Sequence, residues 1–209
     1  MFNNIEFNAI AALCNENNGI GINKTLPWSI KEDYLYYLRV IQTTVNNEKL
    51  NVVIYGRKTW ESLAKDEMPG SKCIKFVLSK TKTKEEINPT NDDKIILCNC
   101  WNQIFDIIKE KYQNIIETIY VLGGEVVYED AIKYKNFNKF YITRIFKYFE
   151  CDVFIKPKNF LDVQFNKIED EKVLKEKENL FNIKYNTIRT DKETNIEYIF
   201  EIYEKKLNN

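Results

Sequence analysis

The chain has 209 residues, of which 44% are hydrophobic and 30% are charged. A chain of this length and composition is expected to fold as one domain, residues 1–209, with a substantial core. The 31 basic and 31 acidic residues give a formal net charge of zero, which argues against a general electrostatic attraction to nucleic acid or to an anionic membrane.

The N-terminal part of the chain predicts a strand, a loop and a helix. Residues 7–13 form a short apolar run that is typical of a buried strand. The Gly-Ile-Gly sequence at residues 19–21 predicts a flexible loop. Ser29 and Glu32 have the spacing of a capping box, so a helix is expected to begin at Ser29, with Asp33 in its first turn at the edge of the buried face.

The rest of the chain continues the alternation. The expected strands cover residues 51–55, 74–78, 95–98, 119–122, 140–145, 152–155 and 163–168. The expected helices cover residues 57–63, 101–110 and 126–133. The charged stretches 81–93 and 170–179 predict solvated loops, or a short exposed helix in the second case; a partner surface is the alternative. Residues 196–205 alternate as a half-solvated antiparallel strand should.

This order of elements predicts the fold class. Strands and helices alternate first, and strands follow at the end, which indicates an α/β domain. We expect a central, mostly parallel twisted sheet with an antiparallel C-terminal strand or strands, flanked by helices. The chain contains no internal repeat and no domain linker.

Proton chemistry in this chain cannot use histidine, because there is none. In an enzyme it would fall to a carboxylate, a lysine, a tyrosine, a cysteine or water. Asp33 follows the sequence Leu26-Pro27-Trp28 and stands among aromatic residues. A carboxylate held against apolar rings is costly to ionise, so its pKa tends to rise. Such a group can hydrogen-bond a polar heterocycle and help to protonate it.

The cysteines do not predict a metal centre or a disulfide framework. There are five, an odd number, and none forms a Cys-x-x-Cys pair. We expect reduced thiols, no metal site and a cytoplasmic location. The N-terminal sequence has no basic segment followed by a long apolar run, and no stretch approaches the ~20 apolar residues of a membrane span.

Two strand-glycine-helix junctions could bind phosphate. They read VVIYGRKTW around Gly56 and IYVLGGEVVYE around Gly123 and Gly124. Free amides and the dipole at a helix N-terminus attract phosphates, so two such turns could hold a pyrophosphate between them. The alternative is that each is an ordinary turn of an α/β protein, and the chain lacks the G-x-G-x-x-G fingerprint of a Rossmann site. Ser79 and Lys80, together with Arg57, could clamp an extra phosphate such as the 2′-phosphate of NADP; alone they would be surface residues.

Several segments in order resemble dihydrofolate reductase: GIGINKTLPW, an acid five residues after Trp28, VVIYGRKTWES, FVLSK, YVLGGEVVY, YITRI and FECDVF. The resemblance extends from about residue 7 to 205 and is strongest to the eukaryotic form, with its extended loop between Trp60 and Ile74 and its final FEIYEK-like strand. It implies reduction of 7,8-dihydrofolate to 5,6,7,8-tetrahydrofolate, with hydride transfer from NADPH to C6 and protonation at N5.

The resemblance also implies residue roles. Asp33 takes the place of the acid that hydrogen-bonds the pterin, Trp28 that of the tryptophan that helps to hold a water, and Thr143 that of the threonine that supports the acid. The implied substrate-binding residues are Ile10, Ala12, Asp33, Tyr34, Tyr37, Ser62, Leu63, Leu122, Tyr128 and Thr143. The implied NADPH-binding residues are Ala12, Ile20, Gly21, Arg57, Lys58, Thr59, Leu78, Ser79, Lys80, Gly123, Gly124, Glu125, Val126 and Val127.

Three positions depart from the family pattern. Cys73 stands where the family has an arginine that pairs with the glutamate α-carboxylate of the substrate, and Tyr37 stands where it has a phenylalanine. Ile155-Lys156 replaces Phe-Pro. Without the arginine, two alternatives stay open: a reductase of the same fold for another pterin or a tailless folate, and a non-catalytic assembly subunit. The expected partner is dihydrofolate, with no nucleic acid or membrane; thymidylate synthase, fused or associated, would lie outside this chain.

Overall fold

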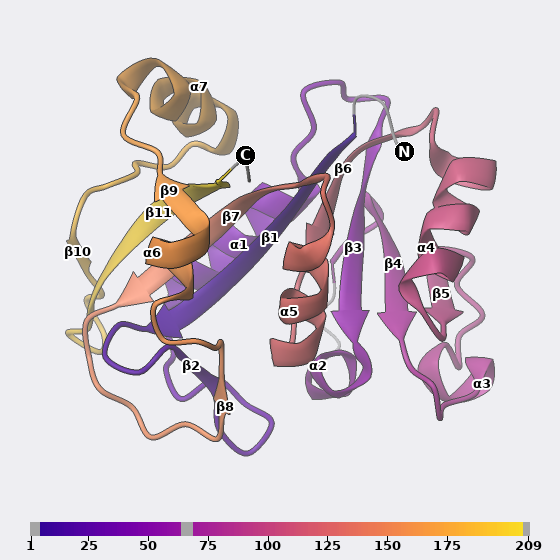
Figure 1. Cartoon of the computed structure of the whole chain (residues 1–209), viewed down its shortest axis with the longest axis horizontal. Coiled ribbons are helices and arrows are strands. Elements are labelled where there is room, and N and C mark those ends of the chain that lie inside the picture. Colours follow the sequence, from indigo (N-terminus) through magenta and orange to yellow (C-terminus); the bar gives the residue numbers. More distant parts are fainter. Residues whose placement is uncertain (1–4, 64–68, 207–209) are drawn as a thin grey trace.

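The computed structural model describes residues 5–63 and 69–206 and is built on a central sheet (Figure 1). Its strands are β1 (Glu6–Cys14), β3 (Leu50–Gly56), β4 (Cys73–Leu78), β5 (Ile95–Cys98), β6 (Ile116–Val121), β7 (Phe137–Ile145), β9 (Phe165–Lys167), β10 (Arg189–Thr190) and β11 (Glu197–Lys205). The strand order is β10-β11-β7-β1-β6-β3-β4-β5, and β9 also pairs with β11.

The direction of the strands confirms the expected sheet. The pairs β1–β6, β1–β7, β3–β6, β3–β4 and β4–β5 are all parallel. The C-terminal strand β11 runs antiparallel to its neighbours β7, β9 and β10. Crossover connections between parallel strands require intervening helices, which is why the sequence alternates between the two.

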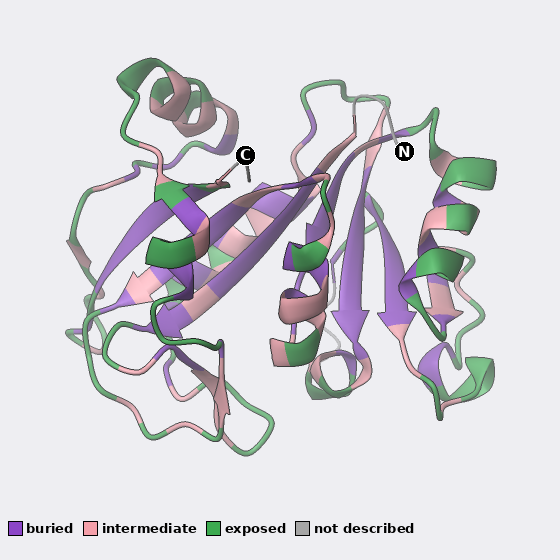
Figure 2. Cartoon of the chain, in the orientation of Figure 1, coloured by how far each residue is buried: buried purple, intermediate pink, exposed green. Residues whose placement is uncertain are grey.

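Helices cover both faces of this sheet (Figures 1 and 2). They are α1 (Lys31–Gln42), α2 (Arg57–Ser62), α3 (Lys84–Ile87), α4 (Trp101–Ile107) with its π-helical continuation η2 (Ile108–Tyr112), α5 (Glu125–Lys133), α6 (Phe160–Gln164) and α7 (Glu171–Phe181). One apolar cluster joins α4, α5 and α6 to the sheet, and a second joins α1, α2 and α7 to its opposite face. The strands between them are buried along most of their length (Figure 2).

A small second sheet lies beside β1. It pairs β2 (Gly19–Gly21) with β8 (Val153–Phe154) in antiparallel fashion. The sequence predicted a flexible loop at residues 19–21, and this was wrong, because a partner strand distant in the chain satisfies the backbone there. A strand at residues 152–155 was expected and is confirmed by β8.

The capping box expected at the start of α1 is not present. The N-cap is Ile30, which makes no side-chain cap, and the helix begins at Lys31 rather than Ser29. Glu32 instead accepts hydrogen bonds from Arg189 Nη1 at 2.9 Å and from the hydroxyl of Tyr198 at 2.6 Å. The Glu32 carboxylate, which the local spacing predicted to cap the helix, therefore binds Arg189 of β10 and Tyr198 of β11 instead.

Three charged or mixed segments hold more helix than their sequences predicted. The stretch 81–93 contains α3, where Thr83 and Glu86 form a capping box. The stretch 170–179 lies in the helix α7, whose N-cap Asp170 accepts from two backbone amides. The strand expected at 163–168 is α6 followed by the shorter β9. In each case the local sequence favours helix, strand and loop by similar amounts, and tertiary packing or a helix cap selects the helix.

Two expectations concern the chain outside these elements. The middle of the long loop between Trp60 and Ile74 lies outside the described residues. Within residues 5–63 and 69–206, no helix has the length and apolar character needed to cross a membrane.

Candidate active site

The carboxylate of Asp33 lies in the first turn of α1 with its side chain turned into the core, where only 8% of the residue is exposed. Burial raises the pKa of Asp33 to about 6, and hydrogen bonding from Thr143 and polar interaction with Trp28 oppose the rise. Thr143 lies on β7 and is 1% exposed. The three residues predicted to carry the chemistry are therefore brought together from two elements and one loop.

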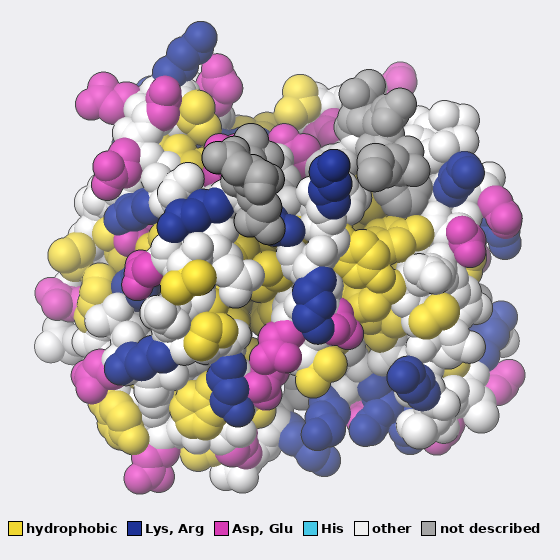
Figure 3. Space-filling model, viewed as in Figure 1, with side chains coloured by type: hydrophobic (Ala, Val, Ile, Leu, Met, Phe, Trp, Pro, Cys, Tyr) yellow, Lys and Arg dark blue, Asp and Glu magenta, His cyan; other side chains and the backbone are white. Residues whose placement is uncertain are grey.

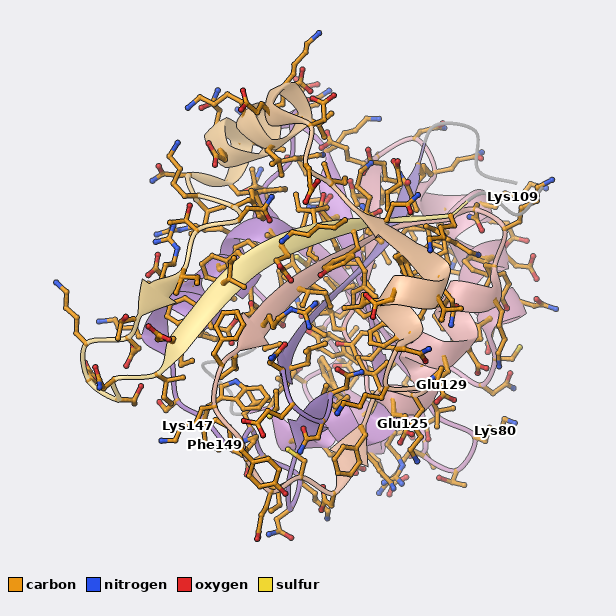
Figure 4. The ribbon with its side chains drawn as sticks, turned by 60° about the vertical axis from the view of Figure 1, so that its left-hand side comes forward. Lys80, Lys109, Glu125, Glu129, Lys147 and Phe149 are labelled. Atoms are coloured by element: carbon orange, nitrogen blue, oxygen red, sulfur yellow. The ribbon has the colours of Figure 1, made fainter. Side chains whose placement is uncertain are left out.

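Trp28 contributes an unpaired donor to this group. Its indole Nε1 is buried and has no partner of proper hydrogen-bond geometry among the described residues, so its effect on Asp33 is that of a nearby dipole. Phe149 holds the indole from the segment before β8, with ring centroids 5.6 Å apart. Lys147 Nζ in turn lies 5.5 Å from the centre of the Phe149 ring (Figure 4). A buried donor without a partner fits a site that takes a polar ligand or a water.

Strand β1 supplies the apolar residues next to the Asp33 group. Ala12 pairs with Thr143 in the parallel register of β1 and β7, which places Ala12 beside the Asp33 group. Ile10 lies two residues earlier and is 5% exposed, and its carbonyl accepts a 2.7 Å hydrogen bond from the hydroxyl of Tyr128. Leu122 is buried as well and belongs to the same apolar cluster as Ile10 and Trp28. Ile10, Ala12 and Leu122 thus lie on the face of the sheet that α1 covers.

The outer part of α1 carries the tyrosines that were expected to meet the substrate. Tyr34 and Tyr37 are half-buried, with ring centroids 6.3 Å apart. The hydroxyl of Tyr37 lies 2.8 Å from that of Tyr55 at the end of β3. Tyr55 thus gives the Tyr37 hydroxyl a hydrogen-bond partner that the family's phenylalanine would not need.

Ser62 and Leu63 end α2 beyond this pair. Ser62 is exposed and its hydroxyl donates to the carbonyl of Thr59 at 2.7 Å, so it closes the helix instead of facing the Asp33 group. Leu63 is partly buried against the apolar cluster that contains Trp60 and Tyr55.

The two glycine junctions meet at the carboxyl ends of β3 and β6. The amide of Gly56 donates to the carbonyl of Gly123 at 2.6 Å. A Cβ at Gly56 would lie 2.8 Å from Val127, and a Cβ at Gly124 would lie 3.3 Å from the hydroxyl oxygen of Thr59. The peptide bond between Gly123 and Gly124 is cis. Side chains have no room in this corner, so the backbone itself is available for close approach by a ligand.

Helices α2 and α5 begin at this corner. Glu125 and Val127 are half-buried in the first turn of α5, and Val126 is exposed by 65%. Glu125 pairs with Lys156 at 3.5 Å. On α2, Lys58 is exposed and Thr59 faces Gly124. Most of the predicted cofactor residues therefore surround one edge of the sheet, although Val126 and Lys58 point outward.

A second group of predicted cofactor residues follows β4. Leu78 pairs with Gly56 in the register of β3 and β4, so Ser79 and Lys80 leave the sheet beside the start of α2. The Ser79 hydroxyl accepts from the amides of Thr81 and Lys82 at 3.3 and 3.1 Å. Lys80 is exposed at this end of the molecule (Figure 4).

The short strand β2 packs beside β1. Ile20 is half-buried and packs on the first apolar cluster, and Gly21 pairs with Val153 of β8. Leu26, in the segment between β2 and α1, is 56% exposed.

Comparison with known proteins identifies the family of this chain. A family model described as dihydrofolate reductase matches residues 6–205. The chain belongs to the dihydrofolate reductase family. The dihydrofolate reductase of Drosophila melanogaster is 35% identical over 161 residues, which are 76% of this chain and 85% of that protein. A viral dihydrofolate reductase of Saimiriine herpesvirus 2 is 32% identical over 205 residues, which are 96% of this chain and 85% of that protein.

The fold agrees with a solved member of the family. Schistosoma mansoni dihydrofolate reductase matches with a TM-score of 0.75 at 23% identity, and the match covers 98% of this chain and 100% of that chain. The expected likeness to eukaryotic dihydrofolate reductases is confirmed by the insect relative. Membership of the family supports an oxidoreductase.

Cys73 departs from the dihydrofolate reductase pattern in a buried place. It begins β4, is 0% exposed, and its thiol donates to the carbonyl of Ile41 at 3.3 Å. Burial raises the pKa of the Cys73 thiol to about 12, so it carries no charge near neutral pH. It therefore cannot replace a guanidinium as a partner for a carboxylate.

No other guanidinium takes over the position. Each arginine of the chain is bonded elsewhere: Arg39 to the carbonyl of Asn182, Arg57 to Glu61, Arg144 to Glu201, and Arg189 to Glu32. The lysines flanking Cys73 are also engaged. Lys72 donates to the carbonyl of Asn47 at 2.9 Å, and Lys75 lies 3.9 Å from Asp92.

A metal centre is not built by the described residues. Across residues 5–63 and 69–206, no group of three or more cysteine, aspartate or glutamate side chains could hold a metal ion.

Proposed function

We propose that this protein is an NADPH-dependent reductase that converts 7,8-dihydrofolate to 5,6,7,8-tetrahydrofolate. The observation that carries the proposal is a single sheet that holds the buried Asp33 group at β1 and β7 and the paired corner of Gly56 and Gly123 at the neighbouring strands β6 and β3. The Asp33 group offers a nitrogen heterocycle a carboxyl with a raised pKa. The glycine corner offers a dinucleotide exposed backbone groups and the N-termini of two helices.

Asp33 is proposed to hold the pterin. Its carboxylate would accept hydrogen bonds from the ring N–H and the amino group, while the Thr143 hydroxyl keeps it oriented. Ile10, Ala12 and Leu122 would contact the flat ring from the apolar side, together with Tyr34, while Tyr128 holds the carbonyl of Ile10 from the other face of the sheet. Fixing the ring in one orientation removes much of the entropic barrier to reaction.

The residues around the glycine corner fit NADPH. Side chains at Gly56 and Gly123 would collide with their neighbours, and one at Gly124 would crowd Thr59, so this corner presents mainly backbone to a pyrophosphate. Arg57, Ser79 and Lys80 would face the 2′-phosphate. When bound, NADPH supplies the hydride that is delivered to C6. Ile20 and Leu26 would cover the site and exclude water.

Protonation at N5 is assigned to the Asp33 group. Its pKa of about 6 keeps a proton within reach near neutral pH. The unpaired Nε1 of Trp28 would hold a water against the ring, and this water would pass the proton onward.

The test is an absorbance assay of NADPH consumption with dihydrofolate, repeated with a diaminopyrimidine antifolate. Asp33→Asn is expected to lose at least about 100-fold in kcat/KM, the usual contribution of a positioned acid. Asp106→Asn, an exposed aspartate of α4, is the matched control and should keep full activity. Oxidation at background level in the parent protein would support the non-catalytic assembly subunit instead.

The bonding of Cys73 and of every arginine favours a second candidate substrate, a folate without the glutamate tail. A missing charge-assisted contact costs about 1.5–3 kcal/mol, which is roughly ten- to a hundredfold in affinity. If the tail makes no contact, dihydrofolate and dihydropteroate will show the same KM. A KM at least tenfold lower for dihydrofolate than for dihydropteroate would show that the protein binds the glutamate tail.

The cellular setting is proposed on the same basis. A cytoplasmic enzyme acting on a small molecule needs neither nucleic acid nor membrane. Fusion to or association with thymidylate synthase remains an extension of this proposal, and co-purification of the two activities from the source cells would test it.

A further inference from the structure

A chain of ion pairs crosses the edge of the sheet where the 2′-phosphate of NADPH is proposed to bind. Glu61 Oε2 lies 2.7 Å from Arg57 Nη1, one turn earlier on α2. The other oxygen, Oε1, lies 3.7 Å from Lys82 Nζ. Lys82 also pairs with Glu86 at 2.8 Å. One carboxylate thus uses an oxygen for each of two cations.

Those two cations come from the two segments that were assigned to the phosphate. Arg57 starts α2 after β3, and Lys82 closes the turn after β4, where its amide donates to Ser79. Figure 3 shows Lys and Arg side chains gathered at this lower edge of the molecule, below the ends of β3 and β4. Neither Glu61 nor Lys82 was singled out by sequence analysis, since the contact depends on strand pairing.

The Glu61 carboxylate lies between Arg57 and Lys82, in the position where a phosphate would bind both cations. The side chains of Arg57, Glu61 and Lys82 are 33%, 38% and 30% exposed, so water and salt weaken their pairing. A phosphate carries nearly two negative charges near neutral pH and three acceptor oxygens, so it can displace a carboxylate from them. The displaced carboxylate then remains nearby on α2 and repels the phosphate.

We propose that Glu61 sets the cofactor preference of this enzyme, as an internal competitor of the 2′-phosphate for Arg57 and Lys82. Lys82 thereby joins the phosphate site. The proposal rests on the proposed function and refines its cofactor selectivity. It requires that Glu61 lower the affinity for NADPH and leave the affinity for NADH, which lacks this phosphate, unchanged.

The experiment measures the Kd of NADPH and of NADH by isothermal titration, without substrate. Glu61→Gln keeps the shape of the side chain and removes its charge, and it is expected to lower the NADPH Kd roughly three- to tenfold. The NADH Kd should stay the same. Lys82→Gln should raise the NADPH Kd by a similar factor without changing that of NADH.

Glu85→Gln is the matched control. Glu85 is an exposed glutamate of α3 in the same region, and it belongs to no ion pair found in the described part of the chain. A general effect of local charge would appear in Glu85→Gln as well, whereas competition predicts no change there. Thermal unfolding of each variant verifies that these exposed substitutions leave the fold intact.

Two outcomes would overturn the proposal separately from the function. An unchanged NADPH Kd in Glu61→Gln would show that Glu61 does not compete, and a raised Kd would show that it orients Arg57 for the phosphate. A parent protein that binds neither NADPH nor NADH would overturn the proposed function and this inference together.

Discussion

The ionisation of Asp33 links the active site to the stability of the protein. Burial raises its pKa from 3.8 to about 6, so the folded protein holds this proton more tightly than the unfolded chain does. Between about pH 4 and 6 the native state binds more protons, and the free energy of unfolding therefore falls as the pH rises. Above that window the ionised carboxylate costs about 3 kcal/mol, two pKa units of differential interaction.

Asp33→Asn should therefore stabilise the protein while it lowers the proposed activity. At about pH 8 we expect the free energy of unfolding to rise by up to about 3 kcal/mol, and at about pH 4 to change little. Urea unfolding at both pH values measures this, with Asp106→Asn as the control. Equal stability of the variant and the parent at the higher pH would mean that Asp33 is not penalised by burial.

Gly123 is the glycine of the corner at which a side chain would be most destabilising. Its φ of +93° is rarely adopted by other residues, and an added Cβ would lie 2.8 Å from the ring of Tyr128. We expect Gly123→Ala to lower the free energy of unfolding by about 2–4 kcal/mol and to weaken NADPH binding. Gly70→Ala is the control, since its nearest atom, on Gln42, lies 3.7 Å away. Similar losses in both variants would contradict the role of the corner.

At the scale of elements, α1 is attached at both ends by side chains from other elements. Arg189 and Tyr198 hold Glu32 at its start. At its end, Asn51 of β3 donates to the carbonyls of Ile41 and Thr43, each at 2.9 Å. These attachments fix the helix that carries Asp33 against the sheet.

Asn51→Ala should release the end of α1. Asn51 is 0% exposed, and its side-chain oxygen Oδ1 also accepts a hydrogen bond from the backbone amide of Thr118 at 3.2 Å. Leaving these buried groups unpaired is expected to lower the free energy of unfolding by about 3–5 kcal/mol. Denaturant unfolding measures the loss, and Asn102→Ala on the exposed side of α4 is the control. A loss below about 1 kcal/mol would show that water replaces the amide.

At the scale of the whole molecule, both apolar clusters share one sheet, so its two halves should unfold together. We expect one cooperative thermal transition, which NADPH at 100 times its Kd should stabilise by about 2.7 kcal/mol. Differential scanning calorimetry with and without NADPH measures both quantities. Two resolved transitions would contradict the single domain expected from the sequence.

The order of strands and helices could be predicted because it depends on near neighbours. Apolar periodicity, the glycines after β3 and β6, and the alternation in β11 are all local patterns. The placement of Asp33 in a buried helical turn also followed from local spacing. The sequence suggested that the two glycine junctions could act together, but the pairing of β3 with β6 is what brings them to one sheet edge. The likeness to dihydrofolate reductase added the role of each residue.

The tertiary structure alone decided which side chains meet. Glu32 left its expected cap for Arg189, which is 157 positions away in the chain. Tyr37 found Tyr55, and Glu61 bridged to Lys82 across two elements. Such bonds are individually weak and depend on distances set by packing, so the local pattern does not encode them. The sequence by itself determined the fold and the place of the acid, and packing determined the partners that tune them.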